Sequence, residues 1–208
     1  MLLDNFYDDP ESIIQIVRGE FPVSGCSSGK KSLDLSQLDS NAYVKFKERI
    51  CSLHNLNVNT VNVHTYFAEQ LYNDVDDIFN NKAIHVDGKG SCSANNYNLL
   101  FCGQIMLTKD PDPEATIKTY RFNTLDSEML EKSINEYTIP GELYRSNKIT
   151  LDEFKILKNK YNSNFELVEE ISNVYNRMVS WVGGTPHNHR VTIKVPVKLD
   201  QYFFIEKA

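Results

Sequence analysis

The sequence predicts an α+β fold built on an antiparallel jelly roll, a double-stranded β-helix core with N-terminal and inserted helices. Three observations predict it. Helical patterns come first in the chain, near-alternating β-branched and aromatic residues begin at residue 57, and a helical region separates these strands from a closing set. We find no internal repeat and no linker, so we expect residues 1–208 to form a single domain.

The helices are predicted from their end signals and apolar spacing. Asp9 provides an N-cap, Pro10 occupies the first turn, and apolar residues at 13, 14, 16 and 17 give one face. Thr150 and Glu153 form a capping box at the start of a later helix. We expect four helices, near residues 10–17, 40–54, 124–137 and 150–161.

The strands are predicted from β-branched and aromatic residues in alternation and from apolar runs between turn signals. Residues 24–31 are rich in Gly, Ser and Lys and predict a loop, and residues 110–113 predict a turn. We expect strands near residues 58–67, 95–108, 117–122, 174–181, 190–199 and 202–205.

Composition excludes several classes of protein. The apolar fraction of 41% and charged fraction of 24% are ordinary for a globular protein, and the net charge of −6 disfavours a nucleic-acid partner. The N-terminus has no basic start and no long apolar run, so we expect neither a signal peptide nor a membrane anchor. The four cysteines include no Cys-x-x-Cys pair, which predicts reduced thiols in a cytoplasmic protein.

The residues that carry chemistry are His85, Asp87 and the distant His187. Two imidazoles and one carboxylate are the facial triad of a non-haem Fe(II), which leaves coordination positions open. In His85-Val-Asp87 the two side chains point to one face of a strand, and His187 follows the predicted strand ending at Trp181. His189 competes with His187 for the third position.

The order of these segments resembles the small prolyl-4-hydroxylase-like bacterial and phage members of the 2-oxoglutarate/Fe(II)-dependent dioxygenase superfamily. The resemblance rests on the His-x-Asp, on Asn176-Arg177 before the distal His187, and on an Arg-x-Thr strand after it. It implies Fe(II) and 2-oxoglutarate as cofactor and co-substrate, with ascorbate as a reductant. It also implies hydroxylation of an unactivated C–H bond in an amino acid, peptide or small metabolite.

Carried over to this sequence, the resemblance makes His85, Asp87 and His187 catalytic iron ligands. Arg190 becomes the partner of the distal carboxylate of 2-oxoglutarate, with Thr192 assisting. The family commonly places about ten residues between the distal His and this cation, whereas here two intervene. Lys194 and Lys198 are therefore alternatives, and Lys198, eleven residues after His187, is the stronger.

Other features of the sequence leave further interpretations open. Alternation along one strand over 190–199 would place Arg190 and Lys198 on the same face. Tyr97 and Tyr120 are candidates to hydrogen-bond the co-substrate, and a plain core role is the alternative for both. Two other functions compete: a non-catalytic jelly-roll binding module, and a cupin-type metalloenzyme that does not use 2-oxoglutarate. We expect a small-molecule or peptidyl substrate, no nucleic acid and no membrane.

Overall fold

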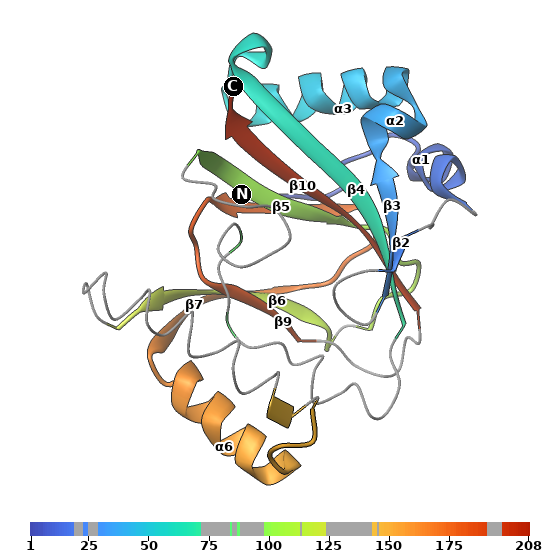
Figure 1. Cartoon of the computed structure of the whole chain (residues 1–208). Helices are drawn as coiled ribbons and strands as arrows, with labels where there is room; N and C mark the ends of the chain where they lie inside the picture. Colours follow the sequence, from blue (N-terminus) through green and yellow to red (C-terminus); the bar gives the residue numbers. More distant parts are fainter. Residues whose placement is uncertain are drawn as a thin grey trace.

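Two antiparallel sheets face each other in the computed structural model of this chain (Figure 1). The large sheet has seven strands and the small sheet has three. Helices cover the face of the large sheet that points away from the small sheet, and one further helix lies beyond the small sheet. The residues that the structure describes are 1–18, 23–24, 29–71, 84, 87, 98–112, 114–123, 143–144, 146–190 and 197–208.

The large sheet has the strand order β1-β8-β5-β10-β4-β3-β2. Its longest pairing joins β4 to β10 in antiparallel register from Val61↔Lys207 to Leu71↔Val197. The strands are β1 (Leu2–Leu3), β2 (Val23–Ser24), β3 (Gly29–Asp34), β4 (Val61–Leu71), β5 (Leu99–Met106), β8 (Arg177–Val182) and β10 (Val197–Lys207).

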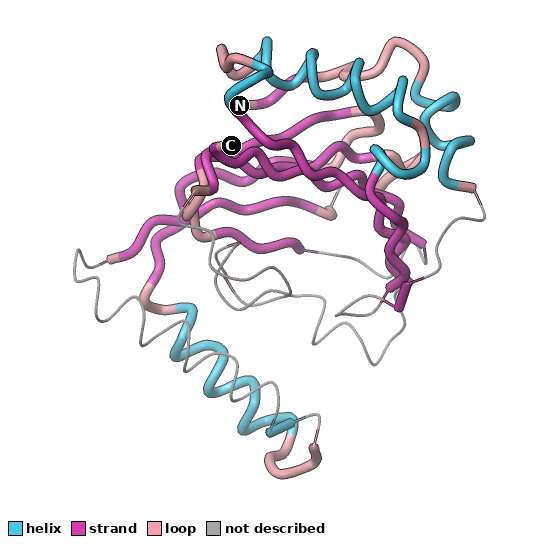
Figure 2. Tube along the Cα trace, turned by 45° about the horizontal axis from the view of Figure 1, so that its top comes forward, coloured by secondary structure: helices cyan, strands magenta, loops and turns pink. Residues whose placement is uncertain are grey.

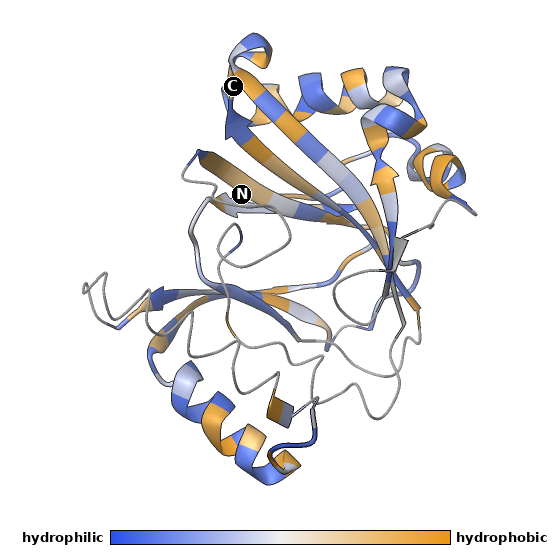
Figure 3. Cartoon of the chain, viewed as in Figure 1, coloured by the Kyte–Doolittle hydropathy of each residue, from blue (hydrophilic) through white to orange (hydrophobic). Residues whose placement is uncertain are grey.

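We call the helix-covered face of the large sheet its outer face and the face toward the small sheet its inner face. The outer face is covered by α1 (Pro10–Val17), α2 (Leu35–Leu38) and α3 (Ser40–Leu53). Polar and apolar residues alternate along β4 and β10, as Figure 3 shows, because successive side chains of a strand point to opposite faces. Odd-numbered residues such as Val63, Phe67 and Phe203 pack in the core under the helices.

Two helices of the outer face, α1 and α3, begin where the sequence predicts. Asp9 caps α1 by accepting a hydrogen bond from the backbone N–H of Ser12, and Pro10 occupies the first turn. Asp39 caps α3 by accepting from the N–H groups of Asn41 and Ala42. Phe46 and Ile50 of α3 are buried against the sheet, so this layer supplies the main hydrophobic core.

The small sheet has the order β7-β6-β9, from β6 (Thr116–Phe122), β7 (Phe165–Ser172) and β9 (His187–Arg190). Helix α6 (Leu151–Asn162) begins with the predicted capping box of Thr150 and Glu153 and lies beyond this sheet (Figure 2). Its Tyr161 packs with Phe165 and Ile84 in a separate cluster. The large and small sheets therefore have separate supporting layers.

The predicted α+β class with an antiparallel jelly-roll core is confirmed. Several details differ, and the short elements β1, β2 and α2 were not predicted. Residues 29–34 form β3 where a loop was expected over 24–31, and η1 (Val58–Thr60) precedes β4. Strand β7 was not predicted, because only Phe165 and Ile171 of its eight residues are buried and no alternation results.

The prediction of one strand over residues 190–199 is wrong. Residue 190 ends β9 in the small sheet, whereas residue 197 begins β10 in the large sheet, and β10 continues without a break to Lys207. Arg190 and Lys198 therefore do not share the face of one strand. The predicted helix at 124–137 lies outside the described residues. None of the helices in the described ranges combines the length and the apolar run that crossing a membrane requires.

Candidate metal centre

Asp87 and His187 meet between the two sheets. The Nε2 atom of His187 lies 3.3 Å from Oδ2 of Asp87, although 100 residues separate them in the sequence. The side chain of His187 is 2% exposed and that of Asp87 is 19% exposed, so the pair is largely shielded from water. The structure thus brings together two of the three predicted iron ligands; His85 lies outside the described residues.

The ring of His187 is held from two sides. Its Nδ1 donates to the carbonyl of Thr185 over 3.0 Å, and its ring centroid lies 4.5 Å from that of Trp181. A carbonyl only accepts, so Nδ1 carries a proton, and Nε2, the atom that faces Asp87, is the ring nitrogen available to a metal ion. An Nδ1–H···O=C bond of this kind is the usual support of a metal-bound histidine.

A glycine turn sets the position of His187. Gly184 has φ +87°, a conformation that residues with a Cβ rarely adopt, and it joins β8 to the segment before β9. The backbone then passes Pro186, whose carbonyl accepts from the N–H of Tyr120 at 2.8 Å, and His187 enters β9 opposite Thr119. The turn therefore fixes which residue of the segment reaches Asp87.

Two side chains of the large sheet lie close to the carboxylate of Asp87. Burial and the negative charge of Asp87 both raise the pKa of the Cys102 thiol, and the thiol also hydrogen-bonds Asp87. Burial and the same charge raise the pKa of the Tyr66 phenol. Cys102 and Tyr66 lie on β5 and β4, so Asp87 sits over the inner face of the large sheet.

The donor set fits a metal ion of the predicted kind. Ligands about 2.1 Å from one ion and adjacent in its coordination sphere lie about 3 Å apart, close to the Asp87–His187 distance. A carboxylate and an imidazole are two donors of the facial triad. Among the described residues no group of three His, Cys, Asp or Glu side chains is assembled, so the third donor stays a prediction at His85.

A second charged cluster lies on β10. Lys198 Nζ is 2.7 Å from Asp200 Oδ2, and these side chains are 7% and 1% exposed. The hydroxyl of Tyr202 lies 3.4 Å from the same oxygen. Alternation from the core residue Phe203 places Lys198, Asp200 and Tyr202 on the inner face. A buried cation therefore lies on the face that also carries Cys102.

The remaining predicted site residues are placed differently. Tyr120 donates to Oδ1 of Asn188 at 3.1 Å and packs against Phe165 near α6. His189 is buried, with ring contacts to His187 and Tyr202. Tyr97, Thr192 and Lys194 lie outside the described residues, as does the side chain of Arg190, whose backbone pairs with Thr116. Their roles stay predictions.

Sequence reasoning did not single out Cys102, Tyr66 or Asp200. Cys102 was predicted to be a reduced thiol, and both it and Cys51 are buried and take part in no disulfide in the structure. Tyr66 lies in a predicted strand, and only the pairing of distant strands brings it near Asp87. Asp200 lies two residues after Lys198 in the sequence. An acid this close to a candidate anchor was the only sequence signal for the ion pair.

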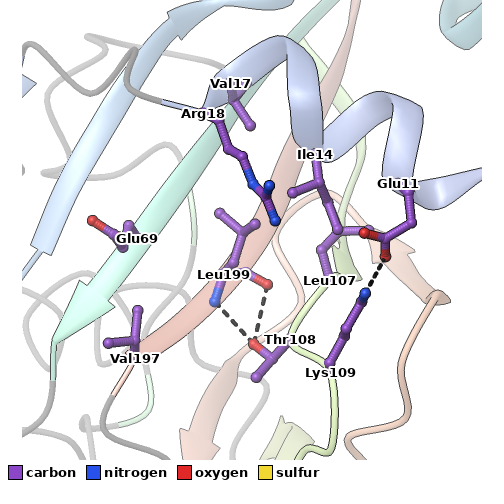
Figure 4. A pocket seen from close by; sticks show the side chains of 10 residues that line it. All are labelled: Glu11, Ile14, Val17, Arg18, Glu69, Leu107, Thr108, Lys109, Val197 and Leu199. Carbon is purple, nitrogen blue, oxygen red and sulfur yellow. Dashed lines mark hydrogen bonds and ion pairs between the residues drawn. The ribbon is translucent and has the colours of Figure 1, made fainter.

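A cavity of about 480 Å³ lies on the outer face, next to α1 (Figure 4). Its apolar floor includes Ile14 and Leu199, and its polar rim includes an ion pair of 3.0 Å between Lys109 and Glu11. Glu11 also accepts from the hydroxyl of Tyr175. No histidine lines this cavity among the described residues, so it lacks the imidazoles of the predicted iron site.

Solved structures share this fold. HygX from Streptomyces hygroscopicus with nickel and 2-oxoglutarate bound superposes with a TM-score of 0.58 at 11% identity, over 100% of this chain and 82% of that chain. HygX with nickel, 2-oxoglutarate and hygromycin B gives 0.56 at 10%, with the same coverage. A Pseudomonas putida prolyl-4-hydroxylase gives 0.50 at 8%, over 100% of this chain and 92% of that one.

No protein-family model matches this sequence, and no curated protein sequence does. At identities of 8–11% the structural similarity establishes the shared fold alone. The chemistry must therefore be argued from the residues between the two sheets.

Proposed function

We propose that this protein is an Fe(II)- and 2-oxoglutarate-dependent oxygenase that hydroxylates an unactivated C–H bond of an amino acid, a peptide or a small metabolite. The observation that carries the proposal is the 3.3 Å approach of Asp87 to His187, shielded between the sheets of a jelly roll. HygX, which has the same fold, has been solved with nickel and 2-oxoglutarate bound and also with iron bound.

The protein's own residues would hold and shelter the metal. Asp87 and His187 supply two ligands and His85 is proposed as the third, while Thr185 and Trp181 fix the ring of His187. When bound, Fe(II) supplies O2 activation coupled to oxidative decarboxylation of 2-oxoglutarate to succinate and CO2. The buried inner face limits water around the reacting groups.

For the distal carboxylate of 2-oxoglutarate we favour Lys198 over Arg190. Lys198 is a buried cation on the inner face of β10. Arg190 was favoured because it was expected to open one strand that runs to residue 199. The structure instead divides this segment between two sheets. Asp200 already pairs with Lys198, so binding of a second carboxylate requires this pair to open or to share its cation.

The Lys198–Asp200 pair also favours a second candidate function. If Asp200 retains the cation, a dicarboxylate has no free anchor at this position, and the protein would be a cupin-type metalloenzyme without 2-oxoglutarate. The two candidates differ in one respect that can be measured, because only the first binds 2-oxoglutarate next to the metal.

Anaerobic titration with Fe(II) and then 2-oxoglutarate tests the proposal. We expect a visible metal-to-ligand charge-transfer band that saturates with 2-oxoglutarate and is missing in His187→Ala. In air, with ascorbate present, the protein should convert 2-oxoglutarate slowly to succinate, and N-oxalylglycine should inhibit this turnover. Metal binding with neither band nor succinate would support the cupin-type candidate. An intact fold without metal affinity would instead leave a non-catalytic binding module.

A further inference from the structure

Gln104 is a buried carboxamide that the fold leaves without hydrogen bonds. It lies on β5, is 0% exposed, and neither Oε1 nor Nε2 has a partner among the residues that the structure describes. A buried polar atom without a partner destabilises the folded state, because it has lost its hydrogen bonds to water. A glutamine with both amide atoms unsatisfied is unfavourable at this position, unless a bound molecule supplies the hydrogen-bond partners.

The strand register places Gln104 between the metal centre and the Lys198–Asp200 pair. On β5 it shares the inner face with Cys102, the residue that contacts Asp87. Across the ladder it lies opposite Tyr202, whose neighbour on the same face is Asp200. Diagonal neighbours of this kind are about 7–8 Å apart, within reach of long side chains.

A second buried glutamine on the same sheet has both of its amide atoms hydrogen-bonded. Gln201, also 0% exposed, is paired in the ladder with Ile105, next to Gln104, but points to the outer face. Its Oε1 accepts from the hydroxyl of Tyr7 at 2.5 Å, and its Nε2 donates to Oγ1 of Thr65 at 2.9 Å. The fold therefore satisfies the amide on the outer face and not the one on the inner face.

We infer that Gln104 is a co-substrate-binding residue, whose Nε2 donates to an oxygen of a 2-oxo acid lying between Asp87 and Lys198. This inference rests on the proposed function. A 2-oxo dicarboxylate that reaches from the metal to Lys198 passes the position of Gln104 and carries only acceptors at both ends. The Nε2 donor suits these acceptors. Oε1 of the amide is then left for a donor such as an ordered water.

Three variants test the inference: Gln104→Met, Gln104→Glu and the matched control Gln201→Met. Three quantities are measured for each: the melting temperature of the metal-free protein, the Kd of Mn(II), and the Kd of 2-oxoglutarate for the Mn(II)-loaded protein without O2. Calorimetry gives the two affinities. Mn(II) accepts the same nitrogen and oxygen ligands as Fe(II) without starting turnover.

We expect Gln104→Met to raise or preserve the melting temperature, because an apolar side chain of similar shape removes unsatisfied atoms. The same variant should weaken 2-oxoglutarate binding about tenfold or more and leave the Kd of Mn(II) within about twofold. Gln104→Glu should weaken 2-oxoglutarate binding further, since its carboxylate repels the negatively charged co-substrate. Gln201→Met should lower the melting temperature by a few degrees and leave both affinities unchanged.

Unchanged 2-oxoglutarate affinity in Gln104→Met and Gln104→Glu would overturn the inference while the proposed function stands. A clear loss of melting temperature in Gln104→Met would also overturn it, because the amide would then have a structural partner. If the unmodified protein binds Mn(II) but no 2-oxoglutarate, the proposed function itself fails. The two failures are therefore distinct.

Discussion

The two faces of the large sheet treat their buried glutamines in opposite ways. On the outer face, Gln201 bonds Thr65, whose backbone N–H bonds Oδ2 of Asp34. On the inner face, Gln104 and Oδ1 of Asp200 are buried without hydrogen-bond partners in the described part of the chain. The difference teaches that the outer glutamine contributes to the stability of the fold, whereas the inner glutamine is the one that we propose as a ligand-binding residue.

Apolar packing shows the same division. Phe203 of β10 is 0% exposed on the outer face and packs against Phe46 of α3, with ring centroids 5.9 Å apart. Its neighbour Phe204 is half-buried on the inner face and stacks on Tyr66 at 6.1 Å. Changes on the outer face should therefore alter stability, and changes on the inner face should alter binding.

The largest expected effect concerns the metal ligands of the inner face. Asp87→Ala should weaken metal binding by more than the roughly 10–100-fold that loss of an outer-sphere partner costs. The free energy of unfolding of the metal-free protein should change by less than about 1 kcal/mol, because His187 keeps its hydrogen bond to the Thr185 carbonyl when the carboxylate is removed. Metal titration and urea denaturation measure the two quantities.

Asp34→Ala is the matched control for Asp87→Ala on the outer face. Asp34 caps α2 and accepts from the N–H groups of Ser36 and Thr65. Its loss should lower the free energy of unfolding by about 1–3 kcal/mol without changing metal affinity. If the two aspartate variants behave alike in both measurements, the contrast between the faces is wrong.

The next effect is on the stability of the core. Phe203→Ala should lower the free energy of unfolding by about 3–5 kcal/mol, because it leaves a cavity under α3. Phe204→Ala should cost less than half as much, since its side chain is only partly buried. Urea denaturation of both variants gives the comparison, and equal costs would contradict it.

A smaller effect decides between the two candidate anchors. Lys198→Ala should raise the KM of uncoupled 2-oxoglutarate turnover about a hundredfold, because a buried carboxylate loses its cation. Arg190→Ala should change this KM little. The opposite result would restore the prediction made from the sequence.

Lys198→Ala also leaves Asp200 as a buried charge without its cation. The double variant Lys198→Met with Asp200→Asn removes both charges and should keep the fold more stable than the single variant. A high KM in both variants assigns the effect to the lost cation rather than to partial unfolding.

The smallest effect is a pH dependence at the end of α3. Desolvation, and then the charge of the N-terminal amino group, lower the pKa of His54 from its ordinary 6.5. As the pH falls below about 7, His54 takes up its proton in the unfolded chain before it does so in the folded protein. The free energy of unfolding therefore decreases with falling pH until the pH reaches the pKa of His54 in the folded protein. The expected slope is below the roughly 1.4 kcal/mol per pH unit of one full proton.

His54→Leu checks the origin of this slope. The variant should remove that part of the pH dependence below about pH 7 in urea denaturation, while the stability above pH 7 changes little with pH. An unchanged slope in the variant would assign the pH dependence to other groups.

The sequence predicted the local structures that carry strong local signals. Helix α6 has a capping box, and β5 is an apolar run, so both were recognised. Strand β7 was missed because Glu166, Glu169 and Glu170 are exposed and only two residues are buried. A register shift opposite Thr119 and Tyr120 leaves Val168 out of the pairing, and this interrupts the period-2 pattern of the strand.

The candidate site was predicted in part. His-x-Asp and the distal histidine gave Asp87 and His187, which the structure brings together. Local sequence could not show that Gln104 lacks partners, because that depends on the strands beside it. It also could not show that residues 190 and 197 belong to different sheets, since the alternating pattern continues through both.

The edges of the described sheets bear on self-association. The large sheet ends in two strands of two residues each, β1 and β2, so few of its edge N–H and C=O groups are open to another chain. The edge strand β7 carries its three glutamates. The next strand of the large sheet, the apolar β8 (Arg177–Val182), pairs with β1. Deleting residues 1–5 would uncover that strand, and light scattering should then detect concentration-dependent aggregation that the full chain resists.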